Sequence, residues 1–509
     1  MSTFKLTSVV AAICLAGGVT NHAFAENSTV SQDKTVQLIK KINTRTVELE
    51  NEVKKLRKQL TELKKTEKAN LDKQSKENTS IQNKVKAIKH SKTSLLELGA
   101  TPVISSPYIG VRSQFDGSDL IVNIPTYNQD AQLLIQQSKM LKTFDKKGMT
   151  VPETPMLEIS GKIEGQVLGH RDFNGARSSD ADLSGSEIDL TGHFAPWLTA
   201  FTALSYDNNA PNAGSVVGPT QTRTDNSRIY LDKAFVTFGN LSRTPFYATI
   251  GQRYHFGQYS SFMLSSPLTK SLARIKARSL LVGYQHQTKN GLYSTLYVFK
   301  GDTNVGNNHI NQFGGTIGYE CGNKNIKTDI GLDLVNNIAD AQGMQNTGNK
   351  ESNGLYRGFA YSSDFERLVK RVPGAALHAK FGFGNYSIIG EYVTALKEFD
   401  QSNLSYNGLG AKPSAFNMES AYMFNLMNKP ANIAIGYGQT KNSLALDLPR
   451  SRLVTAFNVS LLKDTIFSLE YKRDKNYNTT DISSFQTLDS IVSMGGFTNT
   501  VTAQFGIYF

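Results

Sequence analysis

The chain ends in Val501-Thr502-Ala503-Gln504-Phe505-Gly506-Ile507-Tyr508-Phe509, a stretch in which side chains of two kinds alternate. Counted back from the C-terminus, Phe509, Ile507 and Phe505 fall on one face, with the polar Gln504 on the other. Successive side chains of a β-strand point to opposite faces. This stretch therefore predicts a final strand that meets an apolar surrounding on one side and a polar one on the other.

The same period of two recurs upstream, for example where Ile159 and Ile163 alternate with Lys162 and Glu164. A strand that faces lipid on one side and water on the other needs such a pattern, although a soluble sandwich shows it too. Strands are expected at 157–171, 185–194, 197–207, 227–240, 245–255, 277–288, 291–301, 309–322, 325–336, 374–384, 386–396, 413–426, 430–440, 450–462, 465–475 and 497–509.

The lengths of the connections separate these two folds. Short turns such as Ala195-Pro196 and Lys463-Asp464 alternate strictly with longer segments, of which 337–373 is the longest. Outer-membrane barrels have short periplasmic turns and long exterior loops, so 157–509 is expected to form an all-β transmembrane barrel of about 16 antiparallel strands. Counts of fourteen or eighteen stay open, because Asp232 and Lys233 fall on opposite faces of the stretch at 227–240.

The start of the chain predicts export. Lys5 precedes an apolar run, and Ala23-Phe24-Ala25 has the small-x-small pattern of a cleavage site, so residues 1–25 are expected to be a signal peptide. Cleavage would leave Cys321 as the one cysteine, which excludes an internal disulfide. The predicted location is the bacterial outer membrane, with the N-terminal arm in the periplasm.

Residues 26–97 form a basic arm with 17 Lys and Arg against 10 Asp and Glu, in a chain of net charge +12. Apolar residues recur every seven from Ile39 to Leu63, which predicts an N-terminal α-helical coiled coil and a homo-oligomer joined through it. A single amphipathic helix is the alternative. A basic exported arm suits anionic envelope partners such as peptidoglycan better than nucleic acid.

Residues 98–156 differ from both neighbours. Leu120 to Ile124 is a strand-like run that Pro125 ends, and Asn128 or Asp130 is placed to cap a helix that continues to Leu141. The pattern predicts a small module, either a periplasmic collar or a segment that enters the pore.

A barrel of sixteen strands leaves a water-filled lumen, and charges of both signs are expected to line it. The predicted pore-lining residues are Lys162, Glu164, Asp189, Arg253, Lys327, Asp329, Asp333, Lys380, Glu391, Glu419, Arg452 and Glu470.

Two basic clusters fall in predicted exterior loops or at their bases. Guanidinium groups bind carboxylates through paired hydrogen bonds, so such clusters suit a polycarboxylate ligand, although lipopolysaccharide phosphates suit them equally. The 337–373 loop is long enough to fold inward and narrow the pore. The candidate ligand-binding residues are Lys270, Arg274, Lys276, Arg278, Arg367, Lys370 and Arg371.

The sequence shows no catalytic signature. The histidines of the predicted barrel lie in no nucleophile motif, and the sequence has no Gly-rich phosphate loop, zinc spacing or paired-cysteine motif. The prediction is a protein without enzymatic activity, cofactor or bound metal.

The exported arm, the module around 119–140 and the barrel opening Leu157-Glu158-Ile159-Ser160-Gly161-Lys162-Ile163 resemble one known group. The chain looks like the siderophore porins typified by the legiobactin receptor of Legionella, with relatives among Francisella proteins for siderophore and ferrous-iron uptake. This resemblance implies passage of a ferric siderophore of polycarboxylate type through the outer membrane. About 350 residues cannot form the plugged twenty-two-stranded barrel of energy-coupled transporters. The alternatives are a general or anion-preferring porin, a ferrous-iron channel and an envelope-tethering barrel.

Overall fold

The computed structural model contains all sixteen predicted strands. It describes residues 103–105, 120, 122, 128–146, 155–207, 228–346 and 368–509, apart from short gaps at 258–259, 288–289, 302, 304–308, 324–325, 463 and 484–490. The strands are β2 (Met156–Arg171), β3 (Arg177–Ala195), β4 (Leu198–Asp207), β5 (Arg228–Gly239), β6 (Phe246–His255), β7 (Ile275–Gln285), β8 (Gly291–Phe299), β9 (Gln312–Gly322), β10 (Ile326–Val335), β11 (Gly374–Phe383), β12 (Tyr386–Ala395), β15 (Ser414–Leu426), β16 (Lys429–Lys441), β17 (Ser451–Val459), β18 (Thr465–Lys475) and β21 (Phe497–Tyr508).

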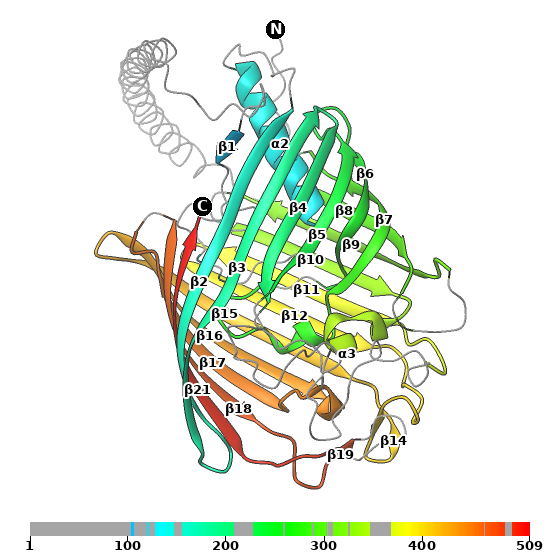
Figure 1. The fold of residues 1–509 in the computed structure, drawn as a ribbon, viewed down its shortest axis with the longest axis vertical. Coiled ribbons are helices and arrows are strands. Elements are labelled where there is room, and N and C mark those ends of the chain that lie inside the picture. The colour runs from blue at the N-terminus through cyan, green and yellow to red at the C-terminus, as the bar shows by residue number, and fades with distance from the viewer. Residues whose placement is uncertain are drawn as a thin grey trace, which may run out of the picture. The chain divides into compact units, whose positions relative to one another are not determined.

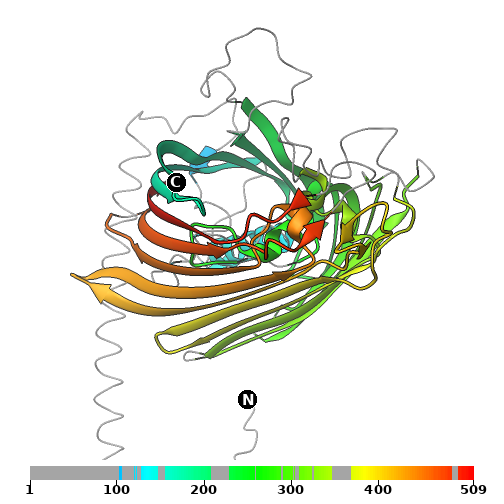
Figure 2. The ribbon, with the colours of Figure 1, turned by 90° about the horizontal axis from the view of Figure 1, so that it is seen from below.

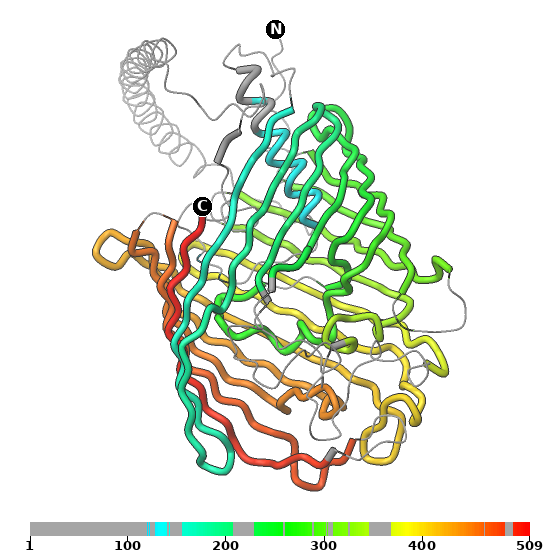
Figure 3. The backbone as a smooth tube through the Cα atoms, viewed as in Figure 1, coloured from blue at the N-terminus to red at the C-terminus, as the bar shows by residue number. Residues whose placement is uncertain are grey.

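Each of these strands pairs antiparallel with its neighbours in the chain, and the last closes the ring on the first (Figures 1 and 2). The C-terminal strand β21 runs between β18 and β2, as the red and teal tubes of Figure 3 show. Gly161 and Phe509 exchange two backbone hydrogen bonds, of 2.7 and 2.9 Å. The predicted all-β barrel of sixteen strands is therefore confirmed.

Smaller elements lie between these strands or precede them. They are β1 (Val103–Ser105), α2 (Gln129–Lys146), η2 (Leu268–Ser271), η3 (Ile338–Asp340), α3 (Gln342–Asn346), β13 (Ser405–Tyr406), β14 (Leu409–Gly410), η4 (Leu444–Leu446), β19 (Ile482–Ser483) and β20 (Ile491–Val492). Strand β1 pairs parallel with β2 from Leu157 to Ile159, beyond the point where β21 ends. It thus covers an edge of β2 that would otherwise lack a partner.

The outer face of the barrel is apolar. Residues that alternate with the interior side chains, such as Val167, Leu296 and Ile317, are half exposed or more. Aromatic side chains flank the short turns: Trp197 stacks on Phe238 with ring centroids 6.3 Å apart. An apolar band with an aromatic girdle is the surface that lipid requires.

Strand β3 is longer than predicted. It starts at Arg177 rather than near residue 185, so a turn of five residues, and no long loop, joins it to β2. The added stretch, Arg177 to Ser184, alternates poorly because it is almost wholly polar. It extends β3 beyond the apolar band, where neither face has to be apolar.

Strand β5 resolves the ambiguity at Asp232 and Lys233, and the expectation that they face opposite sides was wrong. The register with β4 shifts between Ala203 and Leu204, so β5 contains a bulge at Asp232. A bulge adds one residue to a strand and turns two consecutive side chains to the same face. Asp232 and Lys233 are both buried on the inside, with Lys233 Nζ 3.7 Å from the Asp232 carboxylate.

The predicted signal peptide and the coiled coil of the 26–97 arm lie outside the described residues. Among the residues that are described, none of the helices has the length and apolar character to cross a membrane.

Candidate functional site

Residues 256–276, which connect β6 to β7 and include the first two residues of β7, fold inward and cross the barrel at their described positions. We call them the inward loop. Three glutamates on the opposite wall hold it. Glu419 accepts hydrogen bonds from the Phe262 amide at 2.8 Å and the Ser261 hydroxyl at 2.7 Å. Glu470 accepts from the amides of Leu264 and Ser265, and Glu391 accepts from the Thr269 hydroxyl at 2.5 Å. These glutamates come from β15, β18 and β12, so the inward loop is tied across the lumen.

Two further wall residues secure the same loop. Arg452 on β17 donates to the Ser266 carbonyl at 2.9 Å and forms two hydrogen bonds with Asp474, at 2.7 and 2.9 Å. Asn458 donates to the Phe262 carbonyl at 2.8 Å. The loop therefore has fixed attachments along most of its length.

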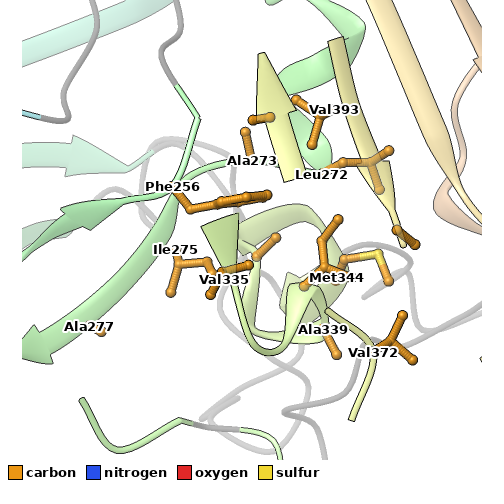
Figure 4. Packing of buried hydrophobic residues seen from close by; sticks show 14 of the residues in the cluster. Phe256, Leu272, Ala273, Ile275, Ala277, Val335, Ala339, Met344, Val372 and Val393 are labelled. Atoms are coloured by element: carbon orange, nitrogen blue, oxygen red, sulfur yellow. The ribbon is translucent and has the colours of Figure 1, made fainter. Parts of the chain in front are cut away.

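An apolar cluster supports the inward loop from the other side. Phe256, Leu272 and Ile275 pack with Val335 and Met344, as Figure 4 shows. Met344 belongs to α3, in the described first part of the 337–373 connection. That connection was expected to fold inward and narrow the pore; its start packs on the 256–276 loop, and that loop itself crosses the lumen.

Helix α2 is the longest described part of the predicted module at 98–156. Helix α2 lies along the inner wall of β4 to β6, where Leu133 packs against Phe201 and Phe235. At its first turn, the buried Asp130 carboxylate contacts the Arg253 guanidinium and accepts a hydrogen bond of 2.7 Å from the Thr249 hydroxyl. We call α2 the lumen helix.

Leu120 and Val122, which precede the lumen helix in the chain, have partners on the opposite wall and on the inward loop. Asn432 on β16 donates to the Leu120 carbonyl at 3.1 Å, and the Val122 amide donates to the Ser261 carbonyl at 3.0 Å. The N-terminal segment and the inward loop are thus joined to each other as well as to the wall.

A cavity of about 830 Å³ remains between the inward loop and the wall formed by β2 to β6. Its charged and aromatic lining residues are Lys162, Lys270, Arg274, Arg452, Asp182, Glu187, Asp232, Tyr206, Tyr230 and Tyr254. Two of the four cations, Lys270 and Arg274, come from the inward loop, and the acids come from β3 and β5. We call this space the lumen cavity.

The acids of the lumen cavity already have cations on their own wall. Lys233 lies 3.1 Å from Glu187, and Lys276 lies 3.0 Å from Asp232, whose carboxylate also accepts from the Tyr254 hydroxyl at 2.7 Å. These pairs neutralise Glu187 and Asp232, two of the three acids that line the cavity.

Two cations of the inward loop contact a hydroxyl group and an aromatic ring. Lys270 Nζ lies 3.0 Å from the Ser266 hydroxyl, and the Arg274 guanidinium lies 4.1 Å from the centre of the Tyr254 ring. Burial, together with the positive charges of Arg274 and Lys162, lowers the pKa of Lys270 to about 7. Lys270, Arg274 and Lys162 thus lie close enough for their positive charges to act on one another at this side of the cavity.

The seven candidate ligand-binding residues separate into different environments. Lys270 and Arg274 belong to a long connection, as predicted for their loop, but this connection folds inward and both residues line the lumen cavity. Lys276 pairs with Asp232. Arg278 is exposed on the outer face of β7, and Lys370 and Arg371 are exposed just before β11. Arg367 lies outside the described residues.

The predicted pore-lining residues occupy interior positions of their strands. Lys162 and Glu164 pair at 3.0 Å, Asp189 is fully buried beside Glu187 on β3, and Arg253 contacts the lumen helix. Lys327, Asp329, Asp333 and Lys380 share the interior face of β10 and β11, where His378 lies 3.6 Å from both aspartates. Glu391, Glu419, Arg452 and Glu470 attach the inward loop. Across the described residues, no group of His, Cys, Asp and Glu is arranged to hold a metal ion.

Three tyrosines of the lumen cavity were not among the predicted site residues. Tyr254 lies on β6 where its pairing with β5 has ended, and Tyr230 precedes the β5 bulge. Gln252 bridges the resulting gap by donating to the carbonyls of Leu231 and Asp232, at 3.1 and 3.2 Å. Strict alternation places Tyr254 on the outer face, so a period of two could not reveal it.

Comparison with known proteins gives relatives for most of the chain. No family model matches it. A UPF0422 protein of Coxiella burnetii is 37% identical over 410 residues, which cover 79% of this chain and 83% of that protein. A UPF0422 protein of Legionella pneumophila is 37% identical over 420 residues, which cover 81% of this chain and 77% of that protein.

Among solved structures, an anion-selective porin from Comamonas acidovorans is similar with a TM-score of 0.44 and 11% identity, over 70% of this chain and all of that one. Because this TM-score and this identity are low, the barrel assignment rests on the strand pairing described above. The selectivity of that porin is not attributed to this chain.

Proposed function

This chain belongs to the UPF0422 family, and we propose that it is an outer-membrane channel for the uptake of iron bound to a polycarboxylate siderophore. The outward apolar band and the aromatic residues beside the short turns support a place in the outer membrane. The short-turn rim then faces the periplasm, where the basic arm was expected. The long connections face the exterior.

The lumen cavity is the observation that carries the proposal. Its volume of about 830 Å³ lies within the range of small-molecule sites. Lys270 and Arg274 place cationic groups on its lining, and Lys162 and Arg452, each paired with an acid, lie beside them. Ammonium and guanidinium groups bind carboxylates through charge-assisted hydrogen bonds, and the neighbouring tyrosines add donors and flat apolar surface. A compact polyanion is therefore the solute that this cavity suits.

The attachments of the inward loop favour a selective channel over a general one. A wide water-filled lumen passes small solutes by size, whereas here the loop and the lumen helix occupy much of the interior. A solute that enters from the long-connection rim meets the loop cations Lys270 and Arg274. Its residence there depends on its negative charge.

Single-channel recording tests this function. Purified protein in a planar bilayer receives ferric citrate, a small ferric polycarboxylate, on the long-connection side. We expect transient blocks of the current in the wild type. Two charged hydrogen bonds contribute about 1.5–3 kcal/mol each, so K270Q/R274Q should weaken the block by at least about tenfold.

The matched control is R278Q, which removes a cation of the same stretch whose side chain is exposed on the outer face. Ferric citrate should block the current through R278Q as it does in the wild type. Equal block in K270Q/R274Q, or conductance indifferent to ferric citrate in the wild type, would contradict the proposal and leave a general porin. If deletion of residues 26–97 weakens the envelope while iron uptake persists, the basic arm serves mainly as a tether.

A further inference from the structure

The outer face of the barrel carries a row of cations at its long-connection end. In the strand register, Arg177 on β3 lies opposite Arg171 on β2, which lies opposite Asn499 on β21, which lies opposite Arg473 on β18. Lys475 follows Arg473 on the same face of β18, opposite Phe497. We call these five polar residues the outer-wall row.

The outer-wall row points away from the lumen. On β18, Arg473 and Lys475 are exposed and alternate with Asp474, which is buried and bonded to Arg452 inside the barrel. Val167 and Val501, on the same face of β2 and β21, are at least half exposed and belong to the apolar band. The single acid within this part of β18 therefore does not neutralise the row.

Such a row is unfavourable without a ligand. Like charges directly opposite each other destabilise a sheet, and Arg171 and Arg177 are such a pair. Arg473 is held in place by its guanidinium, 4.3 Å from the centre of the Phe497 ring, and Asn499 accepts a hydrogen bond of 2.8 Å from Tyr471. A fixed row of donors at a lipid boundary is a complementary surface for phosphate groups.

We propose that the outer-wall row binds the phosphates of lipid A, the glycolipid of the outer leaflet. This inference rests on the outer-membrane orientation given above, but not on the cargo of the channel. Four positions in adjacent strands span about 15 Å, enough for two phosphates on one headgroup. The next pair on this face is Val501 and Tyr471, and Leu469 follows on β18, so the apolar band where acyl chains would lie starts directly below the row. A soluble phosphate would use only the cations, whereas lipid A uses both surfaces.

The test uses the full chain, purified in detergent, with diphosphorylated lipid A as the probe and native mass spectrometry as the readout. The variant R171Q/R177Q/R473Q/K475Q should lose at least tenfold in affinity. The control R278Q/K441Q, which removes two exposed cations elsewhere on the barrel, should bind like the wild type. Heat-modifiable migration on gels shows that each variant is folded.

Two results would overturn the inference. One is unchanged binding of lipid A by the folded quadruple variant. The other is equal competition by dephosphorylated lipid A or by phosphatidylglycerol, which would place the affinity in acyl chains or in any anionic headgroup. Ferric citrate should still block the quadruple variant, so a failure here is distinguishable from a failure of the proposed channel function.

Discussion

Asp130 joins the lumen helix to the barrel wall. Its carboxylate is fully buried and contacts Arg253. It accepts hydrogen bonds from the Thr249 hydroxyl and, at 2.9 Å, from the Ala131 amide. Removal of one partner from a buried ion pair costs about 3–5 kcal/mol, because the other charge remains without compensation.

The variant D130A should therefore lower the melting temperature and raise single-channel conductance, since α2 loses its attachment at the first turn. Q132A, an exposed position on the same helix, serves as the control and should leave both quantities unchanged. Equal conductance in D130A and the wild type would show that the lumen helix does not limit the current.

Lys270 gives the channel a pH dependence. Its pKa is lowered to about 7 by burial, and then by Arg274 and Lys162, so the side chain loses its proton as the pH rises through 7. The positive charge is present at pH 6 and largely absent at pH 8. We expect a higher chloride-to-potassium permeability ratio at pH 6 than at pH 8, measured from the reversal potential in a KCl gradient.

The substitution K270M should abolish this difference while Arg274 still supplies its fixed charge. A wild-type ratio that is the same at both pH values would show that Lys270 keeps one charge state across this range.

At the scale of elements, closure of the barrel depends on β2 and β21. A side chain at Gly161 would come within 2.5 Å of the Glu187 carbonyl oxygen and 2.8 Å of the Phe509 ring. The substitution G161V should therefore reduce the folded fraction and the melting temperature, read from heat-modifiable gel migration. Gly169 lies on the same strand and would meet no atom within 4 Å, so G169V is the control. Equal folding of both variants would exclude this contact as a constraint on closure.

The strands could be predicted from the sequence, because lipid outside and water inside impose a period of two that the residues themselves show. The strand prediction failed at positions where lipid and water no longer impose a period of two. The polar extension of β3 from Arg177 stands beyond the apolar band, and the bulge at Asp232 breaks the period. The inward course of 256–276 depends on Glu391, Glu419 and Glu470, far away in sequence, and no local pattern announces it.

For the whole molecule, the candidate site follows from contacts between distant segments. Lys270 and Arg274 were predicted as ligand residues from their charge alone, but their place inside the barrel follows from the inward loop. Tyr230 and Tyr254 join them only because the pairing between β5 and β6 ends next to the bulge. The barrel could thus be predicted from the sequence, whereas the cavity could not.

Uptake of radiolabelled ferric citrate tests the central claim most directly. Cells that lack the gene would carry wild-type protein, K270Q/R274Q or R278Q at equal outer-membrane levels. The wild type and R278Q should restore uptake, and K270Q/R274Q should restore about a tenth of it or less, given two lost charged contacts. Full restoration by K270Q/R274Q, or none by the wild type, would contradict a cation-lined channel for iron polycarboxylates.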